Sequence, residues 1–135
     1  MSEFIWPVRV YYEDTDSGGV VYYANYLRFM ERARTEYLRS FGFEQDQLIA
    51  DEGVIFAVRS IEVDYRRPAR FNDLLEVSAS VFQRGGASIT FHQEIRRNSE
   101  VLCSGKVKIA SLEAGTMRPV PIPRQIVSAM DTIDK

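Results

Sequence analysis

The sequence predicts an α+β fold, in which one domain spanning residues 1–135 packs an antiparallel sheet on a single long helix. Two observations predict this fold. Apolar residues recur at helical spacing over one stretch, and four later stretches alternate like strands and are joined mostly by tight turns. With 135 residues, of which 45% are apolar, the chain can form one compact core.

The first element is a strand at residues 4–12, where apolar and polar residues mix in a strand-like way. Pro7 within it favours the edge of a sheet, because proline cannot donate a ladder hydrogen bond. Residues 13–19 combine carboxylates, small hydroxyls and two glycines, a composition that is typical of a loop.

The long helix is expected at residues 24–41, and Gly42 after it is a natural helix terminator. Charged side chains such as Arg28 and Glu31 largely fill the side opposite the apolar stripe. We expect Glu31 to form a salt bridge with Arg28, with Arg34 or with a partner chain. The stripe consists of Tyr26, Leu27, Met30, Ala33, Tyr37, Leu38 and Phe41. A short second helix is expected at residues 46–51.

Four strands follow the helices. Residues 54–68 end at Pro68, residues 73–82 alternate regularly, and a Gly85–Gly86 turn leads into residues 88–97. This third strand places Ile89, Phe91, Gln93 and Ile95 on one face. A turn at residues 98–100 precedes the last strand, at residues 101–112. The proline-rich end of the chain contains a short helix at residues 122–130.

Composition limits the classes of function. The formal net charge of −2 argues against a nucleic-acid partner. No run is long and apolar enough to cross a bilayer, and the N-terminus lacks the pattern of a signal peptide. Cys103 is the single cysteine, so no internal disulfide is possible. The sequence also has only one histidine, so we expect no structural zinc site. We therefore expect a soluble, cytoplasmic protein.

Residues 14–26 carry the most informative pattern, a carboxylate-bearing loop that runs through two glycines into the long helix. The first amides of a helix lack internal partners and carry partial positive charge, so they can stabilise an oxyanion. Glycine, here Gly19, lets the backbone approach a ligand closely. The alternative is that an aspartate merely caps the helix, because D-x-x-G is a weak pattern.

Residues 9–39, RVYYEDTDSGGVVYYANYLRFMERARTEYLR, closely resemble the hotdog-fold acyl-CoA thioesterases of the 4-hydroxybenzoyl-CoA thioesterase family. Within that family they are similar to the Tol–Pal-associated group, the YbgC type, and the similarity continues through residues 58–70 and 88–95. The resemblance implies a five-stranded antiparallel sheet wrapped around one long central helix. It also implies homo-oligomers, as dimers or as a dimer of dimers (homotetramer), with active sites at subunit interfaces and no cofactor.

By this resemblance Asp16 is the catalytic carboxylate, and the backbone amide of Tyr23 is the oxyanion donor. Asp16 acts either as nucleophile or as general base for a water, and the sequence leaves both routes open. Many members of the Tol–Pal group carry histidine where this chain has Tyr23. Tyrosine has a pKa of about 10 and is a poor base at neutral pH. We expect His92 to be solvated or at an interface rather than catalytic.

Two sets of basic residues are candidates for binding the phosphates of coenzyme A. Arg84 and Ser88 bound the turn whose basic residues contact the nucleotide end in the family. Arg66, Arg67 and Arg70 cluster near Pro68 and either bind phosphate or form a solvated loop. For the acyl group we expect a lining that includes Tyr22, Tyr26 and Phe56, each of which could equally be ordinary core.

Three functions are compatible with this pattern. The first is hydrolysis of an acyl-CoA thioester. The second is a hotdog dehydratase or hydratase, which usually pairs a histidine with a carboxylate, and this chain has no suitable histidine beside the Asp16 loop. The third is a non-catalytic module that binds acyl-CoA or acyl carrier protein, or that scaffolds enzymes of phospholipid metabolism.

Overall fold

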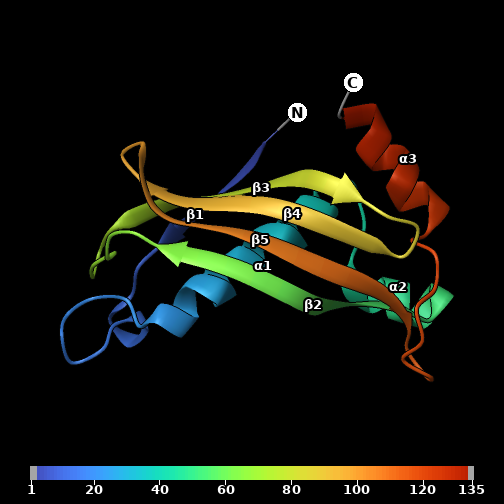
Figure 1. Cartoon of the computed structure of the whole chain (residues 1–135), viewed down its shortest axis with the longest axis horizontal. Coiled ribbons are helices and arrows are strands. Elements are labelled where there is room, and N and C mark those ends of the chain that lie inside the picture. Colours follow the sequence, from blue (N-terminus) through green and yellow to red (C-terminus); the bar gives the residue numbers. More distant parts are fainter. Residues whose placement is uncertain (1–2, 134–135) are drawn as a thin grey trace.

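The computed structural model describes residues 3–133 and shows a five-stranded antiparallel sheet with a long helix on one face (Figure 1). The strand order β1-β3-β4-β5-β2 places the first two strands of the sequence at opposite edges of the sheet. The predicted α+β hotdog fold is therefore confirmed. The elements are β1 (Phe4–Arg9), the short 3₁₀ turn η1 (Tyr12–Asp14), α1 (Tyr23–Arg39), α2 (Gln45–Glu52), β2 (Val54–Tyr65), β3 (Leu74–Arg84), β4 (Ser88–Arg97), β5 (Glu100–Glu113) and α3 (Arg124–Ile133).

Helix α1 packs on β1, β3 and β4, and the core lies between them. Phe29, absent from the predicted stripe, is fully buried, whereas Leu27 is only half-buried. The buried stripe is therefore rotated slightly from the predicted one. Its members are Asn25, Tyr26, Phe29, Met30, Ala33, Arg34, Tyr37 and Leu38.

Strand ends differ from the prediction where local hydrogen bonds redirect the chain. The first strand stops at Arg9 because the Asp14 carboxylate accepts the Tyr11 N–H at 2.8 Å and folds residues 12–14 into a turn. Strand β2 stops at Tyr65 because the N–H groups of Arg66 and Arg67 both donate to the Leu102 carbonyl. The strand Ser88–Arg97 agrees with the prediction at both ends.

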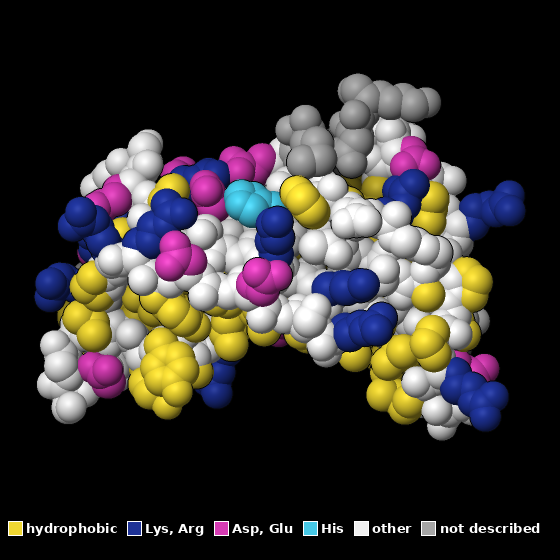
Figure 2. Space-filling view, viewed as in Figure 1, with side chains coloured by type: hydrophobic (Ala, Val, Ile, Leu, Met, Phe, Trp, Pro, Cys, Tyr) yellow, Lys and Arg dark blue, Asp and Glu magenta, His cyan; other side chains and the backbone are white. Residues whose placement is uncertain are grey.

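Both edge strands are left unpaired on one side. Strand β1 carries Pro7, so the predicted edge position is confirmed. On β2, Val58, Ile61 and Tyr65 are 53%, 38% and 44% exposed. Their ladder partners on β5 are Ile109, Val107 and Cys103, which are buried core residues. The exposed apolar stripe of β2 therefore lies on the face of the sheet that carries α1. Figure 2 shows hydrophobic side chains at both ends of the lower edge of the molecule in this view.

The short helices α2 and α3 lie at the same end of the sheet (Figure 1). Gly53 ends α2 in a left-handed conformation with φ 65°. Helix α3 buries Ile126 and Met130. Among the described helices, none has the length and apolarity needed to cross a bilayer.

Candidate active site

Asp16 lies in a short hydrogen-bonded loop, residues 15–22, which directly precedes α1 and is called the Asp16 loop below. Thr15 and Val21 form an antiparallel bridge, and the Asp16 N–H donates to the Val20 carbonyl at 2.9 Å. Gly19 adopts φ 78°, a left-handed conformation that costs glycine little and other residues more. The backbone of this loop therefore has a defined shape that depends on glycine at position 19.

The Asp16 carboxylate is held on one oxygen. Its Oδ1 accepts the Gly18 N–H at 2.8 Å, and its side chain is exposed in the single chain. Over residues 3–133, Oδ2 has no hydrogen bond and Asp16 has no ion pair. The side chain is thus oriented by the loop, while the second oxygen remains available to act as a base or a nucleophile.

The first turn of α1 leaves backbone donors open. The helix begins at Tyr23, and its N-cap Tyr22 makes no side-chain capping bond. Within the described part of the chain, the N–H groups of Tyr23 and Ala24 have no acceptor, whereas the Asn25 N–H donates to the Tyr22 carbonyl. The Asn25 side chain does not cap the helix either, because it donates to the Asp14 carbonyl at 2.9 Å. An uncapped helix start is a favourable environment for a developing negative charge.

Tyrosine rings surround this helix start. Ring centroids are 4.8 Å apart for Tyr22 and Tyr23, 6.2 Å for Tyr23 and Tyr65, and 5.5 Å for Tyr26 and Tyr65. The Tyr65 hydroxyl also donates to the Tyr23 carbonyl at 3.3 Å. A pocket of about 260 Å³ opens here, lined by Val21, Tyr23, Tyr26, Tyr65, Arg66, Arg67 and Pro68.

Two phenols of this pocket, those of Tyr26 and Tyr65, are poor bases. Burial raises the pKa of both Tyr26 and Tyr65 above the ordinary tyrosine value, so both stay protonated near neutral pH. His92 lies on the opposite face of the sheet, in a separate hollow with Glu62, Asp64 and Lys106. Because His92 is the only histidine of the chain, the carboxylate of Asp16 has no histidine beside it.

A second loop, residues 66–73, contacts the backbone of the Asp16 loop and holds it in place; it is called the supporting loop below. The Val21 N–H donates to the Ala69 carbonyl, and Val20 forms a bridge with Arg70. The Ala69 N–H in turn donates to the Tyr26 hydroxyl at 2.9 Å. One loop thereby contacts both the carboxylate-bearing segment and the helix whose N-terminus faces the pocket.

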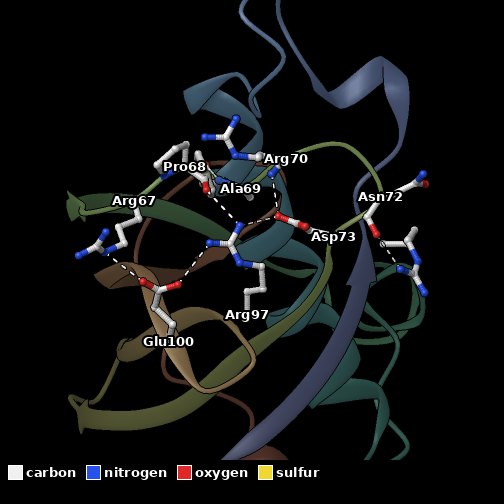
Figure 3. Close-up of polar contacts among 10 residues, drawn as sticks. Arg67, Pro68, Ala69, Arg70, Asn72, Asp73, Arg97 and Glu100 are labelled. Atoms are coloured by element: carbon white, nitrogen blue, oxygen red, sulfur yellow. Dashed lines mark hydrogen bonds and ion pairs between the residues drawn. The ribbon is translucent and has the colours of Figure 1, made fainter.

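Arg97 at the end of β4 fixes the supporting loop (Figure 3). Its Nη1 donates to the Asp73 carboxylate at 2.7 Å and to the Pro68 carbonyl at 3.4 Å, and its Nη2 donates to Glu100. The same oxygen of Asp73 accepts the Arg70 N–H at 2.8 Å. Glu100 also pairs with Arg67, at 3.0 Å. The loop is therefore tied to the sheet at several points.

The structure separates the predicted site residues into two groups. Asp16, Gly19, Tyr22, Tyr23 and Tyr26 all lie at the N-terminal end of α1. Phe56, Arg84 and Ser88 lie at the other end of the sheet: Ser88 pairs with Ala110, which pairs with Ala57 of β2. Arg84 forms an ion pair with Asp131 of α3 at 2.7 Å.

Sequence reasoning missed Tyr65. Tyr65 is 42 residues from Tyr23, and only the path of β2 brings the two rings together. Its position between Asp64 and Arg66, rather than in an apolar run, was the available signal. Glu31 accepts a hydrogen bond from the Thr35 hydroxyl at 2.6 Å and has no ion pair among the described residues. It pairs with neither Arg28 nor Arg34, two of the partners expected for it, and a salt bridge with a partner chain stays a prediction.

This fold and this arrangement define a hotdog-fold protein with a carboxylate loop at an open helix start. The family model of the thioesterase superfamily matches residues 18–104. The chain is 47% identical over 126 residues to the acyl-CoA thioesterase YbgC of Haemophilus influenzae, covering 93% of each chain. The chain belongs to the thioesterase superfamily, in the group of YbgC-type acyl-CoA thioesterases.

Two further comparisons agree with this placement. The acyl-CoA thioester hydrolase YbgC of Escherichia coli O6:H1 is 45% identical over 126 residues, again covering 93% of each chain. The crystal structure of a probable thioesterase from Bartonella henselae superposes with a TM-score of 0.86 at 35% identity. That match covers 90% of this chain and 100% of the other.

Proposed function

We propose that this protein hydrolyses an acyl-CoA thioester to the free acid and coenzyme A. One observation carries the proposal. The Asp16 carboxylate, which has one free oxygen, and the uncapped start of α1 at Tyr23 belong to the same hydrogen-bonded segment. The names of the most similar relatives, acyl-CoA thioesterase and acyl-CoA thioester hydrolase, support the choice of substrate.

In this mechanism the thioester carbonyl accepts a hydrogen bond from the Tyr23 N–H, which stabilises the negative charge on its oxygen. Asp16 either removes a proton from the attacking water or adds to the carbonyl itself and forms an anhydride that water then cleaves. Either way the C–S bond breaks, the thiolate takes up a proton, and the acid is released.

We assign the phosphates of coenzyme A to Arg66 and Arg67, beside the pocket that contains Tyr23. Both line that pocket, and both are exposed. Their present partners are the surface carboxylates of Asp64 and Glu100, at 2.9 and 3.0 Å. Exposed ion pairs of this kind contribute little free energy, so a phosphate can displace the carboxylates.

We further propose that the active site is completed by a second copy of the chain, paired along β2. The free edge of β2 and its exposed residues Val58, Ile61 and Tyr65 support this pairing. Two copies related by a two-fold axis run their β2 strands in opposite directions. The N-terminal half of one strand, with Phe56, then lies beside the C-terminal half of the other, with Tyr65.

This pairing accounts for the separation of the predicted site residues. Phe56 is nine residues from Tyr65 along β2, or about 30 Å, too far to share a pocket within one chain. Phe56, Arg84 and Ser88 occupy one end of the sheet, and an antiparallel pairing brings that end of the second copy toward Tyr23 of the first. Four further expectations stay predictions. They are a dimer of dimers, acyl carrier protein as an alternative carrier, a cytoplasmic location and a link to the Tol–Pal machinery.

Thiol release from a panel of acyl-CoA esters tests the hydrolysis. We expect turnover by the native chain and almost none by Asp16→Asn. A chain that binds acyl-CoA but releases no thiol from any ester would instead be a binding module, and the proposed hydrolysis would be wrong.

A mixing experiment tests the shared site. Asp16→Asn and Phe56→Asp are expected to be inactive alone, but a mixed dimer holds one site with both native residues. Random mixing makes half of the dimers mixed, so about a quarter of native activity should return. No recovery after subunit exchange would contradict a site built from two copies.

A further inference from the structure

Arg34 is a buried cation with an incomplete set of partners. It lies on α1, is 8% exposed, and donates from Nη1 to the Gln93 side-chain oxygen at 2.9 Å. It forms no ion pair with any residue between positions 3 and 133, although Glu31 lines the same pocket as Arg34. Burial of a charge without an ion-pair partner in direct contact is costly, and burial lowers the pKa of Arg34, while the negative charge of Glu31 acts against that effect.

Gln93 fixes where the guanidinium points. Its side chain is fully buried, and its amide nitrogen donates to the carbonyls of Met30 and Ser78 at 3.0 and 3.1 Å. These two bonds orient the amide oxygen toward Arg34. The Arg34 side chain is thereby held in place by a buried amide rather than by a mobile surface group.

The remaining nitrogens of Arg34 are without a protein acceptor among the described residues, and Arg34 lines a pocket. Among the described residues no buried side-chain nitrogen or oxygen lacks a hydrogen-bond partner. Nε and Nη2 of Arg34 have no acceptor in that part of the chain, so they must reach accessible space. Arg34 lines one such space, a pocket of about 190 Å³ between α1 and the sheet. Its other lining residues are Glu31, Thr35, Leu38, Gln45, Phe56, Val58, Phe91 and Ile109.

The pocket combines apolar walls with one fixed cation. Leu38, Phe56, Phe91 and Ile109 offer a surface for a hydrocarbon body. A cavity of about 150 Å³ holds a benzene molecule, so this one admits a body of about five or six carbons. Two free guanidinium donors match the two oxygens of a carboxylate.

We propose that this pocket binds a small carboxylate, with Arg34 as its anion partner and the apolar walls around its short hydrocarbon body. Two sources have this chemistry, and naming them rests on the proposed thioester hydrolysis. One is the distal carboxylate of a dicarboxylic acyl group, and the other is the free acid that the reaction releases. Because Phe56 lines the pocket, the proposed β2 pairing brings the pocket of one copy beside Tyr23 of the other.

Binding of pentanoate and of its neutral isostere pentanamide to the native protein, by calorimetry, tests the proposal directly. We expect pentanoate to bind about tenfold more tightly, because charge-assisted hydrogen bonds to Arg34 are lost with the amide. Equal binding, or no binding of either, overturns the proposal. This measurement requires no turnover, so its failure is distinct from a failure of thiol release.

Two substitutions of opposite charge locate the site. Arg34→Gln should abolish the preference for pentanoate, and Glu31→Gln should strengthen pentanoate binding because it removes the acidic side chain at the pocket. Arg28→Gln, an exposed residue of the same helix, is the matched control and should change nothing. If Arg34→Gln fails to fold, an unchanged affinity in Glu31→Gln alone contradicts the proposal.

Kinetics separate the two sources. A kcat/KM for glutaryl-CoA about tenfold above that for valeryl-CoA, lost in Arg34→Gln, identifies the acyl group as the source. If pentanoate inhibits the enzyme but kcat/KM is the same for glutaryl-CoA and valeryl-CoA, the released acid is the source of the carboxylate.

Discussion

The Ala69 N–H donates a 2.9 Å hydrogen bond to the hydroxyl of Tyr26, and this contact joins the helix of the site to the loop behind it. The Ala69 carbonyl on the other side accepts the Val21 N–H. One residue of the supporting loop thus fixes both the first turn of α1 and the end of the Asp16 loop. The proposed geometry of carboxylate and helix start depends on this residue staying in place.

Tyr26→Phe should loosen this connection. The substitution leaves the Ala69 N–H without its acceptor at a buried position, which costs about 1–3 kcal/mol of unfolding free energy. Denaturant unfolding measures the loss, and kcat should fall more than KM rises, because the misplaced groups act on the transition state. Tyr12→Phe, at a position 78% exposed, is the control and should be neutral in both measurements.

Arg97→Gln should release the supporting loop from β4. The Arg97 guanidinium bonds to Asp73, Pro68 and Glu100, and charge-assisted bonds in a half-buried site are worth about 1.5–3 kcal/mol. We expect lower stability and faster proteolytic cleavage in residues 66–73. Arg39→Gln breaks only exposed pairs with Glu36 and Glu44, which solvent screens, so its effect on stability should be much smaller. Equal effects of the two substitutions would show that the Arg97 network does not hold the loop.

Local patterns predicted most of the fold. The strand Ser88–Arg97 was predicted to the residue because its alternation is regular and turns bound it on both sides. The helix was predicted to begin at Ala24 and begins at Tyr23. The 3₁₀ turn at residues 12–14 was missed, since it depends on one hydrogen bond that the Tyr11 N–H donates to the Asp14 carboxylate.

The candidate site was predictable only where its parts are close in sequence. Asp16 and Tyr23 are seven residues apart, within the longest motif of the family resemblance. The ring of Tyr65 and the buried pair of Arg34 with Gln93 join residues that are 42 and 59 positions apart. Such contacts follow from the order of the strands, which a periodicity does not specify.

Gly19→Ala should reduce activity. Gly19 has φ 78°, a conformation that strains any residue with a Cβ, although no neighbouring atom would meet that Cβ. We expect a loss of about 1 kcal/mol in stability and a larger loss in kcat/KM, because the loop that carries Asp16 shifts. Gly115→Ala also meets no atom but has no left-handed φ, and it should behave like the native protein.

Cys103 should be unreactive in the folded protein. Burial raises the pKa of its thiol to about 12, so the reactive thiolate is scarce at pH 8 and forms only as the pH approaches that value. A disulfide reagent should therefore label Cys103 only after unfolding. The same burial lowers the stability of the folded protein at alkaline pH. Above about pH 9 the unfolded chain releases the thiol proton, whereas the folded chain keeps it until the pH approaches 12. Rapid labelling of the native protein at pH 8 would contradict the burial.

The central claim, that Asp16 performs the chemistry, is tested most directly by measuring thiol release and binding of a non-hydrolysable acyl-CoA analogue for Asp16→Asn beside Asp14→Asn. Asp14 belongs to the same loop, but its carboxylate is occupied by the Tyr11 N–H, and asparagine can still accept that bond. We expect Asp16→Asn to lower kcat by about 10²–10⁴-fold with unchanged affinity for the analogue, and Asp14→Asn to stay within a few-fold of native. Native kcat in Asp16→Asn would contradict the account.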